Sequence, residues 1–261
     1  MKIGIIGIGF VGGAILDSFV IKNISVFGYD KYKKIGSINT ILDTEIVFLC
    51  LPTLYNNEKK EYNKTAIYEV INILNKNNYK GLVVIKSTIE PETTQNLGNK
   101  YTNLNICHNP EFLTARTAFI DFHNQKHIVI GKNKNSNIDK LYNLYKNNYK
   151  GVDISICTSL ESESMKIMCN SFYASKIMLF NEYYKVCETN GSNFNTVKNL
   201  MLKNNWINPM HTFVPGTDGK LGYGGACFPK DSCALNQYMI NNNLKDNIIG
   251  KVIEKCKEYR I

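Results

Sequence analysis

The sequence lacks any hydrophobic run that reaches the roughly 18 residues of a membrane-spanning helix. Its first residues, MKIGIIGIGFVGG, have a short apolar run without the cleavage region of a secretory signal. We therefore expect no contact with a membrane and no signal peptide. Internal repeats and low-complexity tracts are also lacking, which favours a globular protein. With 261 residues, 44% of them hydrophobic, the chain can form one large domain or two ordinary ones.

No CxxC pair occurs among the eight cysteines, and their spacing is irregular. The four histidines do not accompany cysteines at the spacing of metal ligands, so we expect no metal site. Most cysteines lie in apolar runs that resemble strands or helices. This pattern favours reduced thiols in a cytoplasmic protein.

Positive charge is in excess, with 31 Lys and Arg against 22 Asp and Glu. An excess of this sign suits partners that carry phosphate, including nucleic acid and anionic cofactors. The lysines, however, are scattered among asparagines in stretches such as KNKNSN and YKNNYK. We interpret them as a solvated surface and expect no nucleic-acid partner.

Short apolar, β-branched runs alternate with amphipathic segments through the first half of the chain. The runs occupy 2–7, 24–30, 45–51, 81–87, 104–107 and 127–131, and helical patterns cover 62–78 and 136–148. Such alternation predicts an α/β fold with a doubly wound parallel sheet, covered on both faces by helices, in residues 1–153. Residues 154–261 are predicted to be mainly helical, with helices over 159–191 and 193–204, a loop over 206–229 and a helical region over 230–258.

The stretch GIGFVG at 7–12 is a GxGxxG motif between the first predicted strand and the first helix. Gly7 permits a tight turn, Gly9 lets the main chain approach a pyrophosphate, and Gly12 allows close packing of helix and strand. Asp30 ends the next strand at the spacing expected for an acid that binds ribose hydroxyls. Together they predict a Rossmann-type domain that binds NAD rather than NADP. The alternative is a structural glycine turn with Asp30 as a cap.

Seven stretches, in order, resemble the UDP-glucose/GDP-mannose dehydrogenase family of nucleotide-sugar dehydrogenases. The most specific is VPGTDGKLGYGGACFPKD at 214–231, and the others are GIGFVG with Asp30, VFLCLPT (47–53), KSTIEPETT (86–94), NPEFL (109–113), HIVIG (127–131) and ESESMKIMCNSF (161–172). The resemblance implies oxidation of a sugar primary alcohol to a carboxylate with two NAD molecules, UDP-glucose being the favoured substrate. It also implies a helical central domain that carries the cysteine loop and forms a homodimer.

The chemistry gives Cys227 a specific role. A four-electron oxidation passes through an aldehyde, which must add a nucleophile before it can release a second hydride. A thiolate can add and give a thiohemiacetal, which is oxidised to a thioester that water hydrolyses. We expect Pro229 to open a helix whose positive end, with Lys230 nearby, favours the thiolate. The alternative, a small buried hydrophobe, fits Cys169 or Cys187 better.

The resemblance also assigns the other site residues. Catalytic roles fall on Lys166, Asn170, Asp231, Glu111 and Thr88, in addition to Cys227. The cofactor contacts are Gly7, Gly9, Phe10, Val11, Gly12, Asp30, Pro52, Thr53, Thr88 and Lys230. The substrate contacts are Glu111, Phe112, Leu113, Lys166, Asn170, Tyr223, Gly224 and Gly225. Lys166 and Asn170 are four residues apart, so they share one face of the predicted long helix.

The sequence departs from the family in two ways. The family's usual third domain, which holds the nucleotide base, would follow Ile261, so we expect much of that site to lie outside this sequence. The family's arginine about eight residues before Val-Pro-Gly corresponds to Trp206, which can stack on a base but cannot neutralise a phosphate. Arg116 either replaces that charge or is a solvated arginine.

Two other functions remain open. β-Hydroxyacid dehydrogenases pair the same type of domains, use a Lys-xxx-Asn helix and transfer one hydride without a thiol. A truncated subunit that binds NAD without activity of its own is the other possibility.

Overall fold

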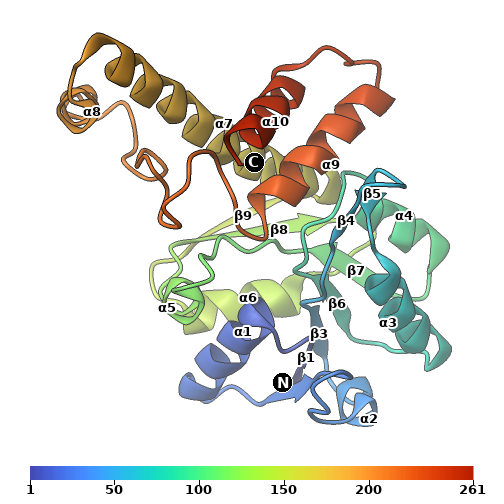
Figure 1. Ribbon diagram of the computed structural model, residues 1–261. Helices are drawn as coiled ribbons and strands as arrows, with labels where there is room; N and C mark the ends of the chain where they lie inside the picture. The colour runs from blue at the N-terminus through green and yellow to red at the C-terminus, as the bar shows by residue number, and fades with distance from the viewer. Residues whose placement is uncertain (261) are drawn as a thin grey trace. The chain divides into compact units, whose positions relative to one another are not determined.

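The computed structural model describes residues 1–260, which form two compact units (Figure 1). The first unit consists of Met1–Leu54 and Tyr62–Lys166. The second consists of Tyr55–Glu61 and the residues from Ile167 onward. The domain limits of 1–153 and 154–261 stay a prediction, since the compact units have other bounds.

A seven-stranded sheet forms the centre of the first unit, in the order β2-β1-β3-β6-β7-β8-β9. All neighbouring strands are parallel except β7 and β8. The strands are β1 (Ile3–Ile6), β2 (Val26–Tyr29), β3 (Ile46–Leu49), β6 (Leu82–Ile85), β7 (Asn105–His108), β8 (His127–Lys132) and β9 (Asp153–Thr158). The first six lie where the apolar runs predicted strands. The edge strand β9 was not predicted, because polar residues interrupt its apolar ones.

Two hydrophobic cores cover the two faces of this sheet. Strand residues alternate between them, so that Ile5 and Phe48 belong to one core while Ile6 and Leu49 belong to the other. Helices α1 (Phe10–Ile21), α5 (Ala118–His123) and α6 (Asp139–Asn148) pack on the first face; α2 (Ile38–Leu42), α3 (Thr65–Lys76) and α4 (Thr93–Lys100) pack on the second. The predicted Rossmann-type α/β fold is confirmed, with β7 and β8 as the antiparallel exception.

The second unit is mainly helical. Its helices are the part of α7 (Ser159–Asn190) from Ile167 onward, α8 (Phe194–Leu202), α9 (Phe228–Asn241) and α10 (Ile248–Tyr259). Ala174, Met178, Tyr223 and Cys256 form a core shared by α7, α10 and the loop before α9. The predicted helical region 230–258 is divided by a turn, where Asn243 has a left-handed φ of 67° and Asn247 caps α10. A short hairpin joins β4 (Tyr55–Asn56) and β5 (Glu61–Tyr62).

The first two turns of α7 belong to the first unit and bury a polar face. The Ser159 hydroxyl donates to Asn133 Oδ1 (2.6 Å), and Ser162 Oγ lies 2.8 Å from His108 Nδ1. Glu163 accepts from the Thr94 backbone N–H (2.7 Å). Specific hydrogen bonds rather than apolar contacts therefore fix the start of this helix. None of the helices in residues 1–260 combines the length and the apolar surface needed to cross a membrane.

Candidate active site

The glycine turn lies between β1 and α1, where the strand order changes direction. Gly7 has a φ of 90°, and a Cβ at Gly12 would lie 1.9 Å from the Gly7 carbonyl oxygen. A Cβ at Gly9 would meet nothing within 4 Å, and no side chain caps the first amides of α1. Two glycines are therefore required by the protein itself, while the third leaves open space beside unsatisfied N–H groups. This arrangement fits a dinucleotide pyrophosphate.

Asp30 follows β2 and fastens the glycine turn. Its Oδ2 accepts from the Ile8 N–H (2.9 Å), and Oδ1 accepts from the N–H groups of Tyr32 (3.0 Å) and Lys33 (2.9 Å). Burial alone would raise the pKa of Asp30, but these backbone bonds lower it. The carboxylate is thus ionised at neutral pH. It retains accepting capacity for ribose hydroxyls, so the cap and the cofactor roles are compatible.

The ends of β3 and β6 meet beside this turn. The Leu51 N–H donates to Ser87 Oγ (2.9 Å), and the Thr53 hydroxyl donates to the Thr88 carbonyl (2.8 Å). A Cβ at Gly7 would lie 2.4 Å from the Cys50 carbonyl oxygen, so these segments are adjacent. Among the other predicted cofactor contacts, Phe10 is 75% exposed beside Gly9. The first unit therefore gathers the predicted cofactor residues other than Lys230 at the carboxyl ends of β1, β2, β3 and β6.

Glu111 and Lys166 form a buried ion pair in the first unit. Lys166 Nζ lies 3.2 Å from Glu111 Oε1 and donates to the Glu111 carbonyl (2.6 Å). Glu111 Oε2 accepts from the Leu113 N–H (2.6 Å), and Lys166 Nζ lies 5.4 Å from the centre of the Phe112 ring. The lysine that the sequence placed in an apolar helix therefore has a partner. The pair offers a carboxylate and an ammonium group at the end of β7.

Lys86 is a buried functional group that the sequence analysis missed. It is 2% exposed, and its ammonium donates to Asn109 Oδ1 (3.1 Å) and the Pro110 carbonyl (3.2 Å). Burial lowers its pKa to about 8, against partly compensating attraction from nearby Cys50 and Glu111. The segment 109–111 thus contacts two ammonium groups, those of Lys86 and Lys166. A lysine that ends a buried strand, as in GLVVIK, was the available signal.

The second unit holds the predicted nucleophile and its neighbours. Cys227 is exposed at the start of α9, and Pro229 lies in the first turn, as predicted. Asp231 is fully buried one turn later; Asn170 Nδ2 donates to its Oδ2 (2.5 Å), and Lys230 Nζ pairs with its Oδ1 (2.5 Å). Lys230, expected to contact the cofactor, therefore also neutralises Asp231.

The predicted substrate loop precedes this helix. Tyr223 is buried, Gly225 has a φ of 79°, and Gly224 packs against the Arg260 guanidinium. Trp206, which stands at the position of the family's arginine, is 89% exposed. Arg116, which could replace that charge, is exposed as well. The site residues thus fall into two groups, one in each unit. Helix α7 contributes Lys166 to the first and Asn170 to the second, one helical turn apart.

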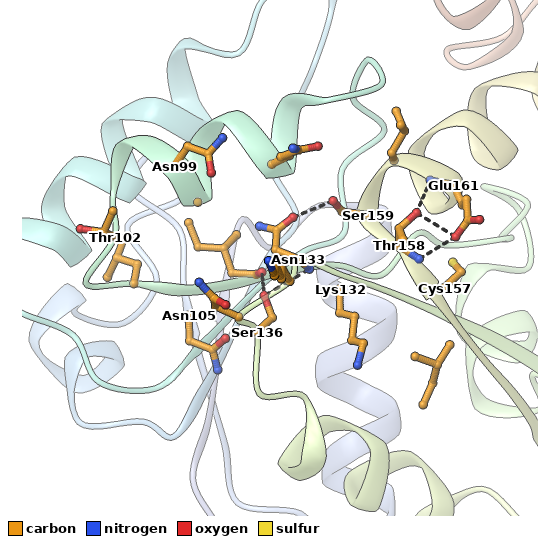
Figure 2. Close-up of a pocket in the computed structure, with 18 of the residues that line it drawn as sticks. Asn99, Thr102, Asn105, Lys132, Asn133, Ser136, Cys157, Thr158, Ser159 and Glu161 are labelled. Atoms are coloured by element: carbon orange, nitrogen blue, oxygen red, sulfur yellow. Dashed lines mark hydrogen bonds between the residues drawn. The ribbon is translucent and has the colours of Figure 1, made fainter.

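A cavity of about 1020 Å³ lies elsewhere in the first unit (Figure 2). It is lined by the start of β7 and the ends of β8 and β9, so it faces the edge of the sheet opposite the glycine turn. Many of its polar groups are bonded to each other: Ser159 donates to Asn133, Ser136 donates to the Ile106 carbonyl, and Glu161 caps the start of α7 through Thr158. It is not the predicted cofactor site.

The fold and the glycine turn define a Rossmann-type dinucleotide-binding protein with an additional helical unit. Residues 34–149 match the NAD-binding domain of the UDP-glucose/GDP-mannose dehydrogenase family, and residues 160–257 match its central domain. The chain belongs to the UDP-glucose/GDP-mannose dehydrogenase family. Its cofactor is accordingly NAD, which the open space at Gly9, the uncapped amides of α1 and Asp30 fit.

A curated relative agrees with this assignment, and solved structures share the fold. The chain is 33% identical over 222 residues to UDP-glucose 6-dehydrogenase of Rickettsia bellii, covering 83% of this chain and 50% of that protein. The structure of a UDP-glucose dehydrogenase from Pyrobaculum islandicum aligns with a TM-score of 0.86 at 22% identity, covering 99% of this chain and 68% of that chain. The chain spans about half the length of the Rickettsia relatives that it matches.

A 3-hydroxyisobutyrate dehydrogenase from Mycobacterium tuberculosis shares the fold as well. Its structure aligns with a TM-score of 0.76 at 12% identity, covering 97% of this chain and 91% of that chain. At this identity the likeness concerns the fold alone.

Proposed function

We propose that the chain oxidises a nucleotide sugar, UDP-glucose in the first instance, at C6 to the uronic acid, with two NAD per turnover. The observation that carries the proposal is the exposed Cys227 at the start of α9, with Asp231 buried one turn later and bonded to Asn170. A cysteine at a helix N-terminus is favoured as thiolate, which is the nucleophile that a four-electron oxidation needs. The relationship to UDP-glucose 6-dehydrogenase of Rickettsia bellii supports the choice of substrate.

The reaction balances as one alcohol, two NAD⁺ and one water giving one carboxylate, two NADH and three protons. Bound NAD supplies the hydride acceptor for each of the two oxidations. In the first, the alcohol loses a hydride from carbon and its hydroxyl proton. The Lys166 ammonium is proposed to stabilise the charge on that oxygen, and Asp231 with Asn170 to orient the water that carries the proton.

The Cys227 thiol takes part in the second oxidation through a covalent bond to the substrate carbon. The Cys227 thiolate adds to the aldehyde carbon, and the carbonyl oxygen takes up a proton to give a thiohemiacetal. The thiohemiacetal then loses a second hydride from carbon and its hydroxyl proton to become a thioester. Water attacks the thioester carbon and the sulfur leaves as thiolate, which regenerates the enzyme. Glu111 is proposed as the base for that water, and Thr88 as a group that holds it. The Glu111–Lys166 pair supports this role, because it and the Leu113 N–H orient the carboxylate.

The remaining predicted contacts are proposed to hold the sugar and the cofactor. Backbone groups of Phe112 and Leu113 lie next to Glu111, while Tyr223, Gly224 and Gly225 precede Cys227 in the glycine loop. Pro52 and Thr53 lie at the end of β3, beside the glycine turn. We keep the cytoplasm as the proposed location.

We further propose that the chain forms a homodimer through α7. Met168, Phe172, Leu179 and Val186 are each at least 50% exposed and recur at helical spacing. Phe172, Leu179 and Trp206 also line an apolar cavity of about 790 Å³ in the second unit. Exposed apolar stripes of this length are typical of protein interfaces. Light scattering should give twice the chain mass, and Phe172→Glu should give one chain mass, whereas Val20→Glu, exposed on α1 in the first unit, should not.

A single-hydride dehydrogenase is the second candidate, because the 3-hydroxyisobutyrate dehydrogenase fold is covered almost completely. The test is NADH formation by the purified chain with UDP-glucose, GDP-mannose, UDP-N-acetylmannosamine and small hydroxy acids. We expect two NADH per UDP-glucose. Cys227→Ser should stop acid formation, while Cys233→Ser, on the same helix, should not.

The other outcomes identify the other candidates. One NADH per hydroxy acid, unaffected by Cys227→Ser, would identify the single-hydride enzyme. NAD binding without turnover of any substrate would identify a subunit that is inactive alone.

A further inference from the structure

The loop from Val214 to Cys227 has no regular structure of its own, although it carries the proposed nucleophile. Gly219, Gly222 and Gly225 all have left-handed φ values between 72° and 79°. Glycine-rich backbone loses much conformational freedom when it is fixed in one conformation. Something beyond the loop must therefore hold it. Within the loop, the Gly216 N–H bonds to the Lys220 carbonyl and the Gly219 N–H to the Gly216 carbonyl (both 2.9 Å).

The end of α10 supplies the main external contacts. Arg260 Nη1 donates to Asp218 Oδ2 (2.8 Å), and Nη2 donates to the Gly222 carbonyl (3.0 Å). One turn earlier, the Cys256 thiol donates to the Tyr223 carbonyl (3.3 Å). The guanidinium thus bridges the two ends of the segment 218–222, and Cys256 holds the next residue. The side chain of Arg260 is 22% exposed and that of Asp218 46%, so the bond to the Gly222 carbonyl is better shielded from water than the ion pair with Asp218.

Two glycines of the loop show how closely α10 approaches it. A Cβ at Gly224 would lie 2.5 Å from Arg260 Nη1, and a Cβ at Gly222 would lie 3.1 Å from the Cys256 sulfur. Gly224 is not in the left-handed region, so its glycine is not explained by backbone conformation. Room for the guanidinium explains it.

Helix α10 is fixed in turn to the long helix. The Tyr259 hydroxyl donates to Glu182 Oε1 on α7 (2.6 Å), next to Asn181, which accepts from the Gly222 N–H (2.9 Å). The loop is therefore held between two helices that are bonded to each other.

We infer that Arg260 is a positioning residue for Cys227, which it holds in place by clamping residues 218–224 of the loop. The positioning role rests on the proposed function, whereas the contacts of the clamp do not. Arg260 is proposed to act through its bonds to the loop rather than on the substrate.

The test measures hydrogen exchange of the loop amides by mass spectrometry in the full chain. Arg260→Gln and Asp218→Ala should each accelerate exchange at residues 219–226 by about tenfold or more, the effect expected from losing a charge-assisted hydrogen bond. Exchange in α9 and the melting temperature should stay close to the wild-type values. Lys251→Gln, which removes an exposed ion pair from the same helix, is the matched control and should change nothing.

A second variant tests the packing. Gly224→Ala should displace the guanidinium and reproduce the faster loop exchange of Arg260→Gln, and the double variant should be no faster than Arg260→Gln alone. Unchanged loop exchange in both Arg260→Gln and Asp218→Ala would overturn the clamp. So would acceleration spread evenly over α9 and α10, which would make Arg260 a general stabiliser of the unit.

The rate at which iodoacetamide alkylates Cys227 extends the test to the sulfur. We expect Arg260→Gln to change this rate severalfold at constant pH, and Lys251→Gln to leave it unchanged. A rate identical to wild type in Arg260→Gln, with a loosened loop, would overturn the positioning role. These measurements need no turnover, so failure of the proposed function, seen as absent NADH formation by the wild type, is recognised separately. Where NADH forms, Arg260→Gln should lower kcat at unchanged KM for NAD.

Discussion

The two glycine-rich segments of this chain are shaped by different kinds of neighbours. In the turn at 7–12, a Cβ at Gly7 or Gly12 would collide with backbone atoms, at 2.4 and 1.9 Å. In the loop before Cys227, a Cβ at Gly222 or Gly224 would meet side chains of α10, at 3.1 and 2.5 Å. Backbone of the sheet cannot move out of the way, whereas the end of an arginine can.

The turn at 7–12 is therefore determined by local sequence, whereas the loop before Cys227 is determined by tertiary contacts. The strand, the turn and the helix of the first segment are consecutive in sequence, so the GxGxxG spacing alone specifies the conformation. The second segment takes its conformation from Asn181 and Arg260, which are 41 and 38 residues from Gly222. No spacing within the loop encodes these partners.

The largest effect is expected from Gly12→Ala. The new methyl group must displace the Gly7 carbonyl, which we expect to cost at least about 3 kcal/mol of unfolding free energy and to abolish NAD binding. Urea denaturation and calorimetric titration with NAD measure both. Gly13→Ala is the control: its Cβ meets nothing within 4 Å, and a helical alanine should stabilise by about 0.5–1 kcal/mol. Equal effects of the two would contradict the distinction between these glycines.

A pH-dependent effect is expected from Lys86→Met, which removes a buried charge at the end of β6 in the first unit. In the folded chain the pKa of Lys86 is about 8, against 10.5 for an exposed lysine, because burial disfavours the ammonium form. Folding therefore releases a proton between these pH values. The penalty is fully present at neutral pH, and the contribution of Lys86 to wild-type stability should become more favourable by about 3 kcal/mol as pH increases from 8 to 10.5.

The difference between wild type and Lys86→Met isolates this term. Buried Tyr79, whose pKa burial raises to about 12, lowers stability at high pH in both proteins alike, because Lys86 does not contribute to its shift. Urea midpoints of both proteins are measured from pH 7 to 10.5. The wild type should gain stability relative to Lys86→Met above pH 8, because only the wild type loses the penalty of the buried ammonium. A constant difference between the two proteins across this range would show that the ammonium is not desolvated.

Much of the fold was predictable because its signals are local. Six strands, the glycine turn and the long helix follow from apolar periodicity and spacing, and the resemblance supplied Glu111 and Lys166. The edge strand β9 was missed because exposure on its open side permits polar residues. The break before α10 depends on the left-handed Asn243, and asparagine is too frequent in this sequence to mark it. Lys86 and Arg260 act through contacts distant in sequence, so no local pattern reveals their roles.

A smaller effect is expected from Asn181→Ala, on α7 in the second unit, where this side chain holds the loop before Cys227. The variant leaves the buried Gly222 N–H without its acceptor and should lower the unfolding free energy by about 1–3 kcal/mol. Asn242→Ala is the control, because this exposed side chain bonds only to the Tyr238 carbonyl one turn earlier. We expect its effect to stay within about 0.5 kcal/mol. Chemical denaturation of both variants tests whether the distant acceptor, rather than the asparagine itself, stabilises the loop.

The smallest effect on stability is expected from Gly9→Ala, and it separates the glycine that serves the ligand from those that serve the fold. A Cβ there meets nothing within 4 Å, and Gly9 has an extended conformation that alanine can adopt. The unfolding free energy should change by less than about 1 kcal/mol, the difference between glycine and alanine at the start of a helix. The methyl group would nevertheless occupy the space left for the pyrophosphate, so calorimetric titration should show NAD affinity reduced at least about tenfold. Unchanged affinity would mean that the cofactor does not approach the chain at Gly9, because every other contact of the turn is preserved in this variant.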